Sequence, residues 1–270
     1  MNLLETIATK IRHSKYLSKY NALWDSVRPL YNQFISQYGK KGLLRKINGT
    51  DNILVLPEFR GVAEVYETDV WHHFMANLQT NDRVVDVGSY IGLYAIAIGK
   101  RLNEEGKVYA FEPDPNNFKA LESHIKLNQL ENNVEAINLA VADKVSTVYF
   151  QSGRDSQSFV SNEYSEDLIP VNSVSLDNYF PTSKIDILKI DVEGYEEKVI
   201  QGATNLLSDK NRKPRLIYLE VHPFAWSNVG TNWDSLLNLL QSHNYKILTF
   251  NGDRPESITW WGEVFAQRLD

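Results

Sequence analysis

The chain carries one run in which an apolar strand passes into a glycine turn and then into a helix: Val84-Val85-Asp86-Val87-Gly88-Ser89-Tyr90-Ile91-Gly92-Leu93-Tyr94. Its three valines are typical of a buried strand in a parallel sheet, and the apolar residues after the second glycine fit a helix start. Gly88 can adopt backbone conformations that other residues avoid, so a ligand can approach the main chain there. The first N–H groups of the following helix lack partners within that helix and can receive an anionic group.

The spacing of this run separates it from a dinucleotide-binding turn. Its pattern, D-x-G-x-x-x-G, lacks the third glycine of G-x-G-x-x-G and has no phosphate-seeking lysine after it. Asp86 would repel a pyrophosphate but would pair with an ammonium group, which favours a ligand with an amino-acid moiety such as S-adenosylmethionine. This run by itself is also compatible with an ordinary strand-to-helix turn in another kind of α/β protein.

Composition sets outer limits on the protein. The 270 residues can bury a large core, and the formal net charge of −6 argues against a nucleic-acid partner. There is no cysteine, which excludes disulfides, a thiolate metal site and a cysteine nucleophile. No run has the roughly 18 apolar residues of a membrane span, and the N-terminus lacks the layout of a signal peptide, so we expect a cytoplasmic location.

Residues 1–80 are expected to form an N-terminal extension of amphipathic helices and a hairpin that caps the ligand-binding side of a domain at 81–270. Asn48-Gly49 marks the hairpin turn, and 67–78 reads as a further helix. The amphipathic N-terminal helices make a homodimer an expectation. A small basic cluster there is better explained by a solvated helix face than by membrane association; it comprises Lys10, Arg12, Lys15 and Lys19.

From Val84 onward, strands and helices alternate. Further core strands are expected at 107–112, 134–142, 185–191, 216–222, 245–250 and 258–267. Helices are expected at 114–128, 194–207 and 233–243, peripheral strands at 147–150 and 171–174, and a mobile surface loop at 152–169. This alternation predicts a doubly wound, mostly parallel sheet whose ligands bind beyond the carboxyl ends of its strands.

Each expected core strand of the first five ends in or near an acid: Asp86, Glu112, Asp143, Asp191 and Glu220. A carboxylate in the position of Glu112 can accept hydrogen bonds from both ribose hydroxyls of a nucleoside. Asp143, beside Ala142, lies where its carboxylate could accept a hydrogen bond from an adenine amino group. A helix N-cap or a loop charge is the alternative for each acid.

These motifs resemble the FkbM family of S-adenosylmethionine-dependent methyltransferases. The resemblance is carried by Val85–Gly88 with Gly92, Phe111-Glu112-Pro113, Leu139–Asp143, Leu188–Gly194 with Glu196, and Leu219–His222. It covers about half of the chain, and Lys-Ile-Asp-Val-Glu-Gly-x-Glu is its most specific piece.

The resemblance implies a Rossmann-like class I methyltransferase domain with a seven-stranded sheet whose last strand runs antiparallel. It implies methyl transfer to a hydroxyl oxygen of a sugar or natural product. Ser89-Tyr90 departs from the small residues common in the first loop, so Tyr90 would cover part of the methionine end of the cofactor. The expected cofactor site comprises Asp86, Gly88, Ser89, Tyr90, Gly92, Glu112, Pro113, Ala142, Asp143 and Asp191.

Methyl transfer to a neutral hydroxyl needs a group that takes the proton. The first hypothesis makes His222 the general base and Glu220, two residues before it on the same strand face, its orienting partner, with Asp191 nearby. A second hypothesis is a divalent cation such as Mg²⁺ held by Asp191, Glu220 and His222. In the third hypothesis, His222 is only hydrogen-bonded at the end of its strand and takes no part in catalysis.

The acceptor side is expected to include Glu193, Trp226, Tyr66 and Trp71, because aromatic faces pack well against sugar C–H groups. Trp233, Trp260 and Trp261 are expected in the core. The sequence thus predicts an O-methyltransferase acting on a small glycosylated or polyhydroxylated acceptor. The alternatives are N-methylation, methylation of a protein- or lipid-linked glycan, a non-catalytic nucleoside-binding module, and, less favoured, a dinucleotide reductase.

Overall fold

The computed structural model describes residues 29, 41–150, 160–161 and 168–270. The helices expected in residues 1–40 and most of the loop expected at 152–169 lie outside the described residues. No helix in the described part of the chain is long and apolar enough to cross a membrane.

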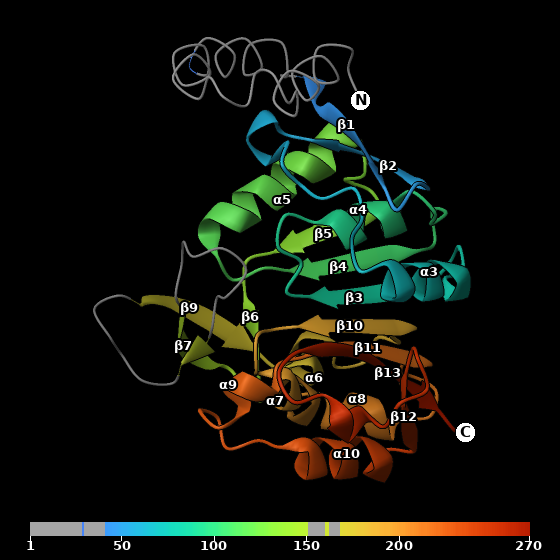
Figure 1. The fold of residues 1–270 in the computed structure, drawn as a ribbon, viewed down its shortest axis with the longest axis vertical. Helices are drawn as coiled ribbons and strands as arrows, with labels where there is room; N and C mark the ends of the chain where they lie inside the picture. Colours follow the sequence, from blue (N-terminus) through green and yellow to red (C-terminus); the bar gives the residue numbers. More distant parts are fainter. Residues whose placement is uncertain (1–28, 30–40, 151–159, 162–167) are drawn as a thin grey trace, which may run out of the picture.

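A seven-stranded sheet forms the centre of the molecule, and Figure 1 shows its strands side by side. Their order is β12 (Tyr245–Thr249), β13 (Gly262–Arg268), β11 (Leu216–Val221), β10 (Ile187–Asp191), β3 (Arg83–Val87), β4 (Lys107–Phe111) and β5 (Val134–Ile137). All are parallel except β13, which is antiparallel to both neighbours. The predicted class I fold with an antiparallel last strand is confirmed. Strand order reverses between β3 and β10, so ligands are expected beyond the carboxyl ends of these two strands.

Helices cover both faces of this sheet. A hairpin of β1 (Leu43–Ile47) and β2 (Asp51–Val55) packs on one face with α3 (Thr68–Asn77), α4 (Leu93–Gly99) and α5 (Pro115–Leu127). The opposite face is covered by α6 (Leu176–Tyr179), α7 (Glu196–Gln201), α8 (Thr204–Ser208) and α10 (Trp233–Ser242). The hairpin turn is where the sequence placed it, and both Asn48 and Gly49 have positive φ.

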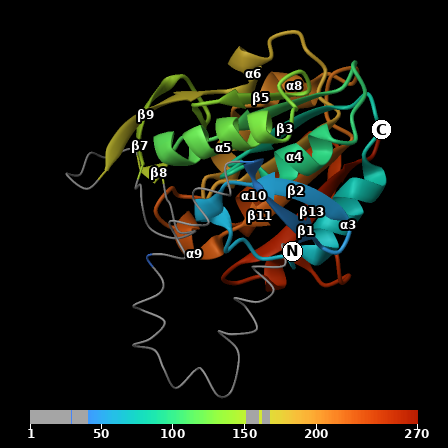
Figure 2. The same ribbon diagram turned by 90° about the horizontal axis from the view of Figure 1, so that it is seen from above.

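A smaller sheet lies beyond the carboxyl ends of β4 and β5 (Figures 1 and 2). Its order is β6 (Ala140–Val141), β9 (Ile169–Val174), β7 (Ser146–Phe150) and β8 (Val160–Ser161). The single strand expected at 134–142 is therefore wrong: β5 ends at Ile137 and β6 joins the smaller sheet. The side chain of Asn138 donates to the carbonyls of Glu112 and Pro113, and the chain leaves the main sheet at this point.

Two further boundaries differ from the expectation. The helix expected at 194–207 is two helices, with Gly202 between them. A Cβ there would lie 2.1 Å from the carbonyl oxygen of Ala142, so the backbone approaches too closely for a side chain. The last strand begins at Gly262 rather than at Ile258, which leaves Trp260 and Trp261 in the loop before it. Short turns complete the chain: η2 (Pro57–Phe59), α9 (Pro223–Trp226) and η3 (Pro255–Ser257).

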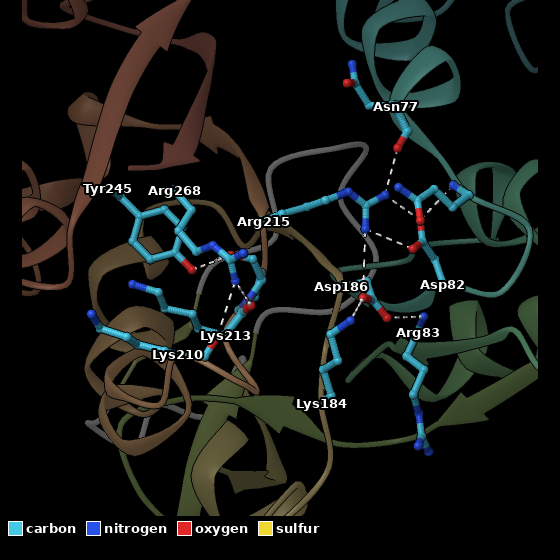
Figure 3. A network of polar contacts seen from close by, with 12 residues as sticks. Asn77, Asp82, Arg83, Lys184, Asp186, Lys210, Lys213, Arg215, Tyr245 and Arg268 are labelled. Carbon is cyan, nitrogen blue, oxygen red and sulfur yellow. Dashed lines mark hydrogen bonds and ion pairs between the residues drawn. The ribbon is translucent and has the colours of Figure 1, made fainter. Parts of the chain in front are cut away.

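Matched ion pairs join the amino ends of the strands (Figure 3). Arg215, just before β11, donates to both carboxylate oxygens of the buried Asp82 at 2.8 and 2.6 Å and also to the carbonyl of Asn77. Asp186 pairs with Lys184 at 2.6 Å and accepts from the backbone N–H of Arg83. Bidentate arginine–carboxylate contacts of this kind fix the relative positions of neighbouring segments.

Candidate active site at the carboxyl ends of the strands

A cavity of about 1020 Å³ opens at the carboxyl ends of β3, β4, β10 and β11. The loops after these four strands form its floor. Residues between β2 and α3, together with the loop before β13, form its walls. The cavity therefore lies where strand order reverses, as the fold predicts.

The turn after β3 is held against both neighbouring strands. Gly88 has a φ of +83°, and a Cβ on it would lie 1.8 Å from the carbonyl oxygen of Asp191. The N–H groups of Gly88 and Ser89 both donate to the carbonyl of Phe111 at 2.9 Å. Tyr90 also has a positive φ, of 50°, which is uncommon for a large residue and is typical of a functional turn.

Glu112 follows β4 and faces the cavity with a buried carboxylate. One oxygen accepts from the N–H of Tyr90 at 2.8 Å, and the other accepts from the N–H of Asp114 at 2.9 Å. The oxygen facing Tyr90 keeps a second acceptor position for a ribose hydroxyl. The other oxygen also accepts from the side-chain amide of Asn117 at a long 3.5 Å, a contact that a second ribose hydroxyl would replace. Burial raises the pKa of Glu112 to about 7, although the two backbone hydrogen bonds act in the opposite direction.

Of the other expected cofactor residues, Gly88, Tyr90, Pro113 and Asp191 line the cavity with Glu112. Asp86, Ser89, Gly92, Ala142 and Asp143 do not. Ser89 donates to the carbonyl of Asp86 beneath the turn, and Asp143 lies 3.8 Å from the amine of Lys198. The apolar wall on this side is instead formed by Leu139, Ala140 and Val141.

Asp86 lies buried in β3, directly opposite Lys189 of β10 in the strand register. Neither of its carboxylate oxygens has a hydrogen-bond partner in the described part of the chain. Burial raises the pKa of Asp86, and the nearby ammonium of Lys189 lowers it. A buried carboxylate without a hydrogen bond is costly, and the charge of Lys189, which is shared with other acids, compensates Asp86 only in part, so its retention beneath the cavity favours a role toward a further positively charged group.

A row of acids continues across the sheet from Asp191. Asp191, Glu220 and Glu263 occupy matching positions on β10, β11 and β13. Glu67 contributes a fourth carboxylate from the start of α3 and accepts from the hydroxyl of Tyr94 at 2.9 Å.

Lys189 is the cation in the middle of these acids. Its amine lies 3.3 Å from a carboxylate oxygen of Asp191 and 4.8 Å from the ring centre of Tyr94. Burial alone would lower the pKa of Lys189, but Asp191, Glu67 and other nearby acids raise it. The ammonium group of Lys189 is thus the shared countercharge of several carboxylates.

The pKa values show the same imbalance of charge. Burial raises the pKa values of Glu67 and Asp191, and it raises those of Glu193 and Glu263 to about 7. Burial would also raise the pKa of Glu220, but the nearby imidazole of His222 and the charge of Lys189 lower it.

His222 follows β11 and is surrounded by carboxylates. Its Nδ1 lies 2.8 Å from Glu196, and its Nε2 lies 3.3 Å from Glu193 and 3.6 Å from Glu220. Burial would lower the pKa of His222, but the hydrogen bond to Glu196 and the nearby carboxylates of Glu220 and Glu193 raise it to about 10. An imidazolium has no acceptor nitrogen, so these surroundings argue against His222 as the general base.

The residue that orients His222 at short range is Glu196 rather than the expected Glu220. The fully buried Glu196 also accepts from the N–H of Gly194 and from the indole of Trp226, each at 2.8 Å. The sequence motif contained Glu196, but its role was missed. Glu67 was missed altogether, because nothing in its local sequence connects it to strand ends 120 or more residues away.

The acceptor side differs from the expectation in its aromatic residues. Tyr66 and Glu193 line the cavity, but Trp71 and Trp226 are buried behind its wall. Trp71 donates to Asp51 at 2.9 Å, and Trp226 donates to Glu196, so both indoles have structural partners. Phe224, Trp260 and Trp261 line the cavity instead.

Comparison with known proteins agrees with this geometry. The family described as methyltransferase FkbM domain matches residues 86–247, which is more than half of the chain. The chain belongs to the FkbM methyltransferase family. It is therefore an S-adenosylmethionine-dependent methyltransferase.

Two curated relatives are similar in sequence. Hexuronic acid methyltransferase AglP of Haloferax volcanii is 24% identical over 179 residues, which span 65% of this chain and 69% of that protein. Methyltransferase sdnD of Sordaria araneosa is 28% identical over 163 residues, covering 47% of this chain and 62% of that protein. A solved structure, methyltransferase FkbM from Methylobacillus flagellatus, is 15% identical with a TM-score of 0.48 and covers 74% of this chain and 47% of that chain.

The FkbM family implies S-adenosylmethionine as cofactor, and the residues present fit it. Gly88 leaves no room for a side chain at the turn, Glu112 offers two acceptor oxygens, and Asp86 is a buried acid without a hydrogen bond in the described chain. The lack of a side chain at Gly88 lets the cofactor approach the main chain closely, the oxygens of Glu112 can bind the ribose, and the charge of Asp86 can attract the ammonium group.

Proposed function

We propose that the protein transfers a methyl group from S-adenosylmethionine to a hydroxyl oxygen of a sugar or another small polyhydroxylated molecule. The observation that supports this most is that one cavity contains both the turn with Gly88 and Glu112 and the carboxylates of Asp191 and Glu193. The similarity to a protein named as a hexuronic acid methyltransferase supports a sugar acceptor.

The residues divide into two groups by their positions in the cavity. Gly88, Tyr90 and Glu112 would hold the nucleoside, and Asp86 would attract the ammonium group from beneath. The bound cofactor supplies an activated methyl group on a sulfonium centre. The remaining task of the protein is to hold the acceptor oxygen close to that methyl group and to receive the hydroxyl proton.

We assign the proton-accepting position to a carboxylate, Asp191 or Glu193, instead of His222. Both carboxylates line the cavity, whereas both ring nitrogens of His222 already face acids. His222 would then act as a positioning residue: Glu196 holds its Nδ1, and its Nε2 side faces Glu193. This arrangement leaves the acceptor hydroxyl next to a carboxylate oxygen.

A divalent cation is a second candidate for activating the acceptor. Asp191, Glu193 and His222 each offer one ligand atom, and these atoms lie within 4.8 Å of one another; Glu67, Asp191 and Glu220 form a second such group. The contact between His222 Nδ1 and Glu196 matches the carboxylate–histidine arrangement that often supports metal ligands. If a cation is required, exhaustive chelation abolishes transfer and Mg²⁺ or Mn²⁺ restores it; full activity after chelation contradicts the requirement.

The described part of the N-terminal extension contributes a wall to the cavity. Phe59, Val62 and Tyr66, between β2 and α3, all line it. We extend this to the proposal that the described residues 41–80 cap the acceptor side; residues 1–28 and 30–40 lie outside the described part of the chain.

The test of the proposed function is transfer of isotopically labelled methyl from S-adenosylmethionine to a panel of sugars, polyols and amines. We expect label on hydroxyl oxygen and its loss in Asp191→Asn or in Glu193→Gln, depending on which carboxylate receives the proton, with binding of S-adenosylhomocysteine retained in both. Label only on amines would favour N-methylation. Tight S-adenosylhomocysteine binding without transfer to any acceptor would favour a non-catalytic binding module.

A further inference from the structure

The rim of the cavity gathers exposed apolar side chains. The described residues include seven large hydrophobic side chains that are exposed, and four of them line this cavity: Val65, Tyr90, Trp260 and Trp261. Trp260 is 66% exposed and Trp261 is 51% exposed. Exposed tryptophans that gather at a pocket mark a binding surface, because leaving their rings in water gives up the free energy of burial.

The two indoles are held in fixed orientations. Phe224 stacks on Trp260 with ring centres 4.8 Å apart and an angle of 26° between the planes. The indole nitrogen of Trp261 donates to the carboxylate of Glu220. Aromatic rings fixed in this way lose little conformational entropy when a ligand packs against them.

Charge on the cavity wall restricts the ligand further. Seven acids line the cavity, and among its lining residues in the described chain His222 is the sole side chain able to carry a positive charge; the acids are Glu58, Glu67, Glu112, Asp114, Asp191, Glu193 and Glu220. No lysine or arginine belongs to this described lining. Above about pH 7, where Glu112 and Glu193 are also ionised, like charges at the binding site are strongly unfavourable, so a carboxylate on the acceptor would be repelled.

We propose that Trp260, Trp261 and Phe224 form the acceptor subsite for a pyranose ring that carries no carboxylate. The C–H face of the ring packs on the indoles, and its hydroxyls donate to the carboxylates of Glu193 and Asp191. This inference rests on the proposed function and narrows it. It separates this chain from its relative named for a hexuronic acid.

The test measures sugar binding to the 270-residue chain saturated with S-adenosylhomocysteine. The probes are methyl glucoside, methyl glucosaminide and methyl glucuronide, titrated by calorimetry with EDTA and, separately, with Mg²⁺. We expect millimolar binding of the first two and at least tenfold weaker binding of the glucuronide. Trp260→Ala should weaken binding of methyl glucoside at least tenfold, and Leu269→Ala, which removes an equally exposed side chain away from the cavity, should leave it unchanged.

Three outcomes overturn the inference: no binding of any of the three sugars, equal binding by wild type and Trp260→Ala, or tightest binding of the glucuronide under either condition. S-adenosylhomocysteine binding is measured first for each protein. Its absence in the wild type removes the proposed function as well, whereas its presence without sugar binding overturns the acceptor subsite alone.

Discussion

The central sheet has acids at both ends, and the two ends differ in how these acids are paired with cations and hydrogen-bond donors. At the amino end, Asp82 has a bidentate arginine, and Asp186 has a lysine and a backbone N–H. At the carboxyl end, several acids share Lys189, and Asp86 has no hydrogen-bond partner in the described chain. Matched pairs stabilise a junction, whereas unmatched buried charges persist where a ligand or a reaction needs them.

The backbone shows a smaller difference, because Gln129 and Asn244, in the loops before β5 and β12 at the amino end, also have positive φ. Three residues that line the cavity have positive φ without being glycine: Glu67, Tyr90 and Glu193. Such conformations cost free energy and cluster at functional sites. The carboxyl end therefore combines electrostatic and conformational costs, and the amino end supplies stability that offsets them.

The largest expected effect comes from Gly88→Ala. Its Cβ would lie 1.8 Å from the carbonyl oxygen of Asp191, so β3 and β10 must separate. We expect a loss of about 4 kcal/mol in the free energy of unfolding and no detectable S-adenosylhomocysteine binding. Gly49→Ala is the matched control, because Gly49 also has a positive φ but no atom within 4 Å of its added Cβ; it should cost about 1 kcal/mol and leave binding intact. Equal behaviour of the two variants would contradict the crowding at the turn.

Arg215→Ala tests the amino end. The change leaves the buried carboxylate of Asp82 without its bidentate partner, which we expect to cost about 3 kcal/mol in the free energy of unfolding. Below the unfolding transition, methyl transfer and S-adenosylhomocysteine binding should match those of wild type. Arg254→Ala, at an exposed position in the loop before β13, is the control and should change stability by less than about 0.5 kcal/mol. Selective loss of cofactor binding in folded Arg215→Ala would erase the distinction between the two ends.

The pH dependence of cofactor binding isolates Glu112. Because the pKa of this buried carboxyl lies near 7, lowering the pH from 8 to 6 should protonate it and weaken S-adenosylhomocysteine binding about tenfold. The same raised pKa means that Glu112 lowers the stability of the folded protein as pH rises from about 4.5 to 7. Calorimetry at several pH values measures the change in affinity. Glu112→Gln should bind more weakly and lose this part of the pH dependence, and a flat wild-type profile would show that ribose recognition does not use the ionised acid.

The smallest effect is a gain in stability from Glu67→Gln. Since burial raises the pKa of Glu67, its ionised form at pH 8 opposes folding, and a neutral amide can still accept from the hydroxyl of Tyr94. We expect urea unfolding at pH 8 to show a gain of about 1 kcal/mol that shrinks at pH 4, together with reduced methyl transfer. Glu131→Gln, at an exposed position, should do neither. A less stable Glu67→Gln would mean that the acids at this end are stabilising after all.

The strand–turn–helix motif and the strand-end acids could be predicted because their signals are local. The alternating strands predicted the fold, and Gly88 and Glu112 lie where their positions in the motif placed them, in the lining of the cavity. The end of β5 and the break at Gly202 could not be predicted. They depend on Asn138 binding the carbonyls of Glu112 and Pro113 and on the carbonyl of Ala142 approaching Gly202.

The positions of the aromatic side chains could be predicted from the sequence even less well. Trp226 follows the predicted catalytic strand directly, yet its indole binds Glu196 beneath the cavity wall. Trp260 and Trp261 read as part of a strand, but β13 begins after them, and the antiparallel return brings them over the carboxyl end of β11. Which side of a loop faces a cavity depends on distant packing that adjacent residues do not encode.

The central claim, that the carboxyl end is a cofactor site built around Glu112 and the turn at Gly88, is tested most directly by calorimetric titration with S-adenosylhomocysteine. We expect one-to-one micromolar binding by wild type. Glu112→Ala should weaken it by about 2 kcal/mol, roughly thirtyfold, because hydrogen bonds to a buried carboxylate are lost, and Glu122→Ala on the exposed side of α5 should not change it. Absence of binding in the wild type, or equal affinity in Glu112→Ala, would contradict the account.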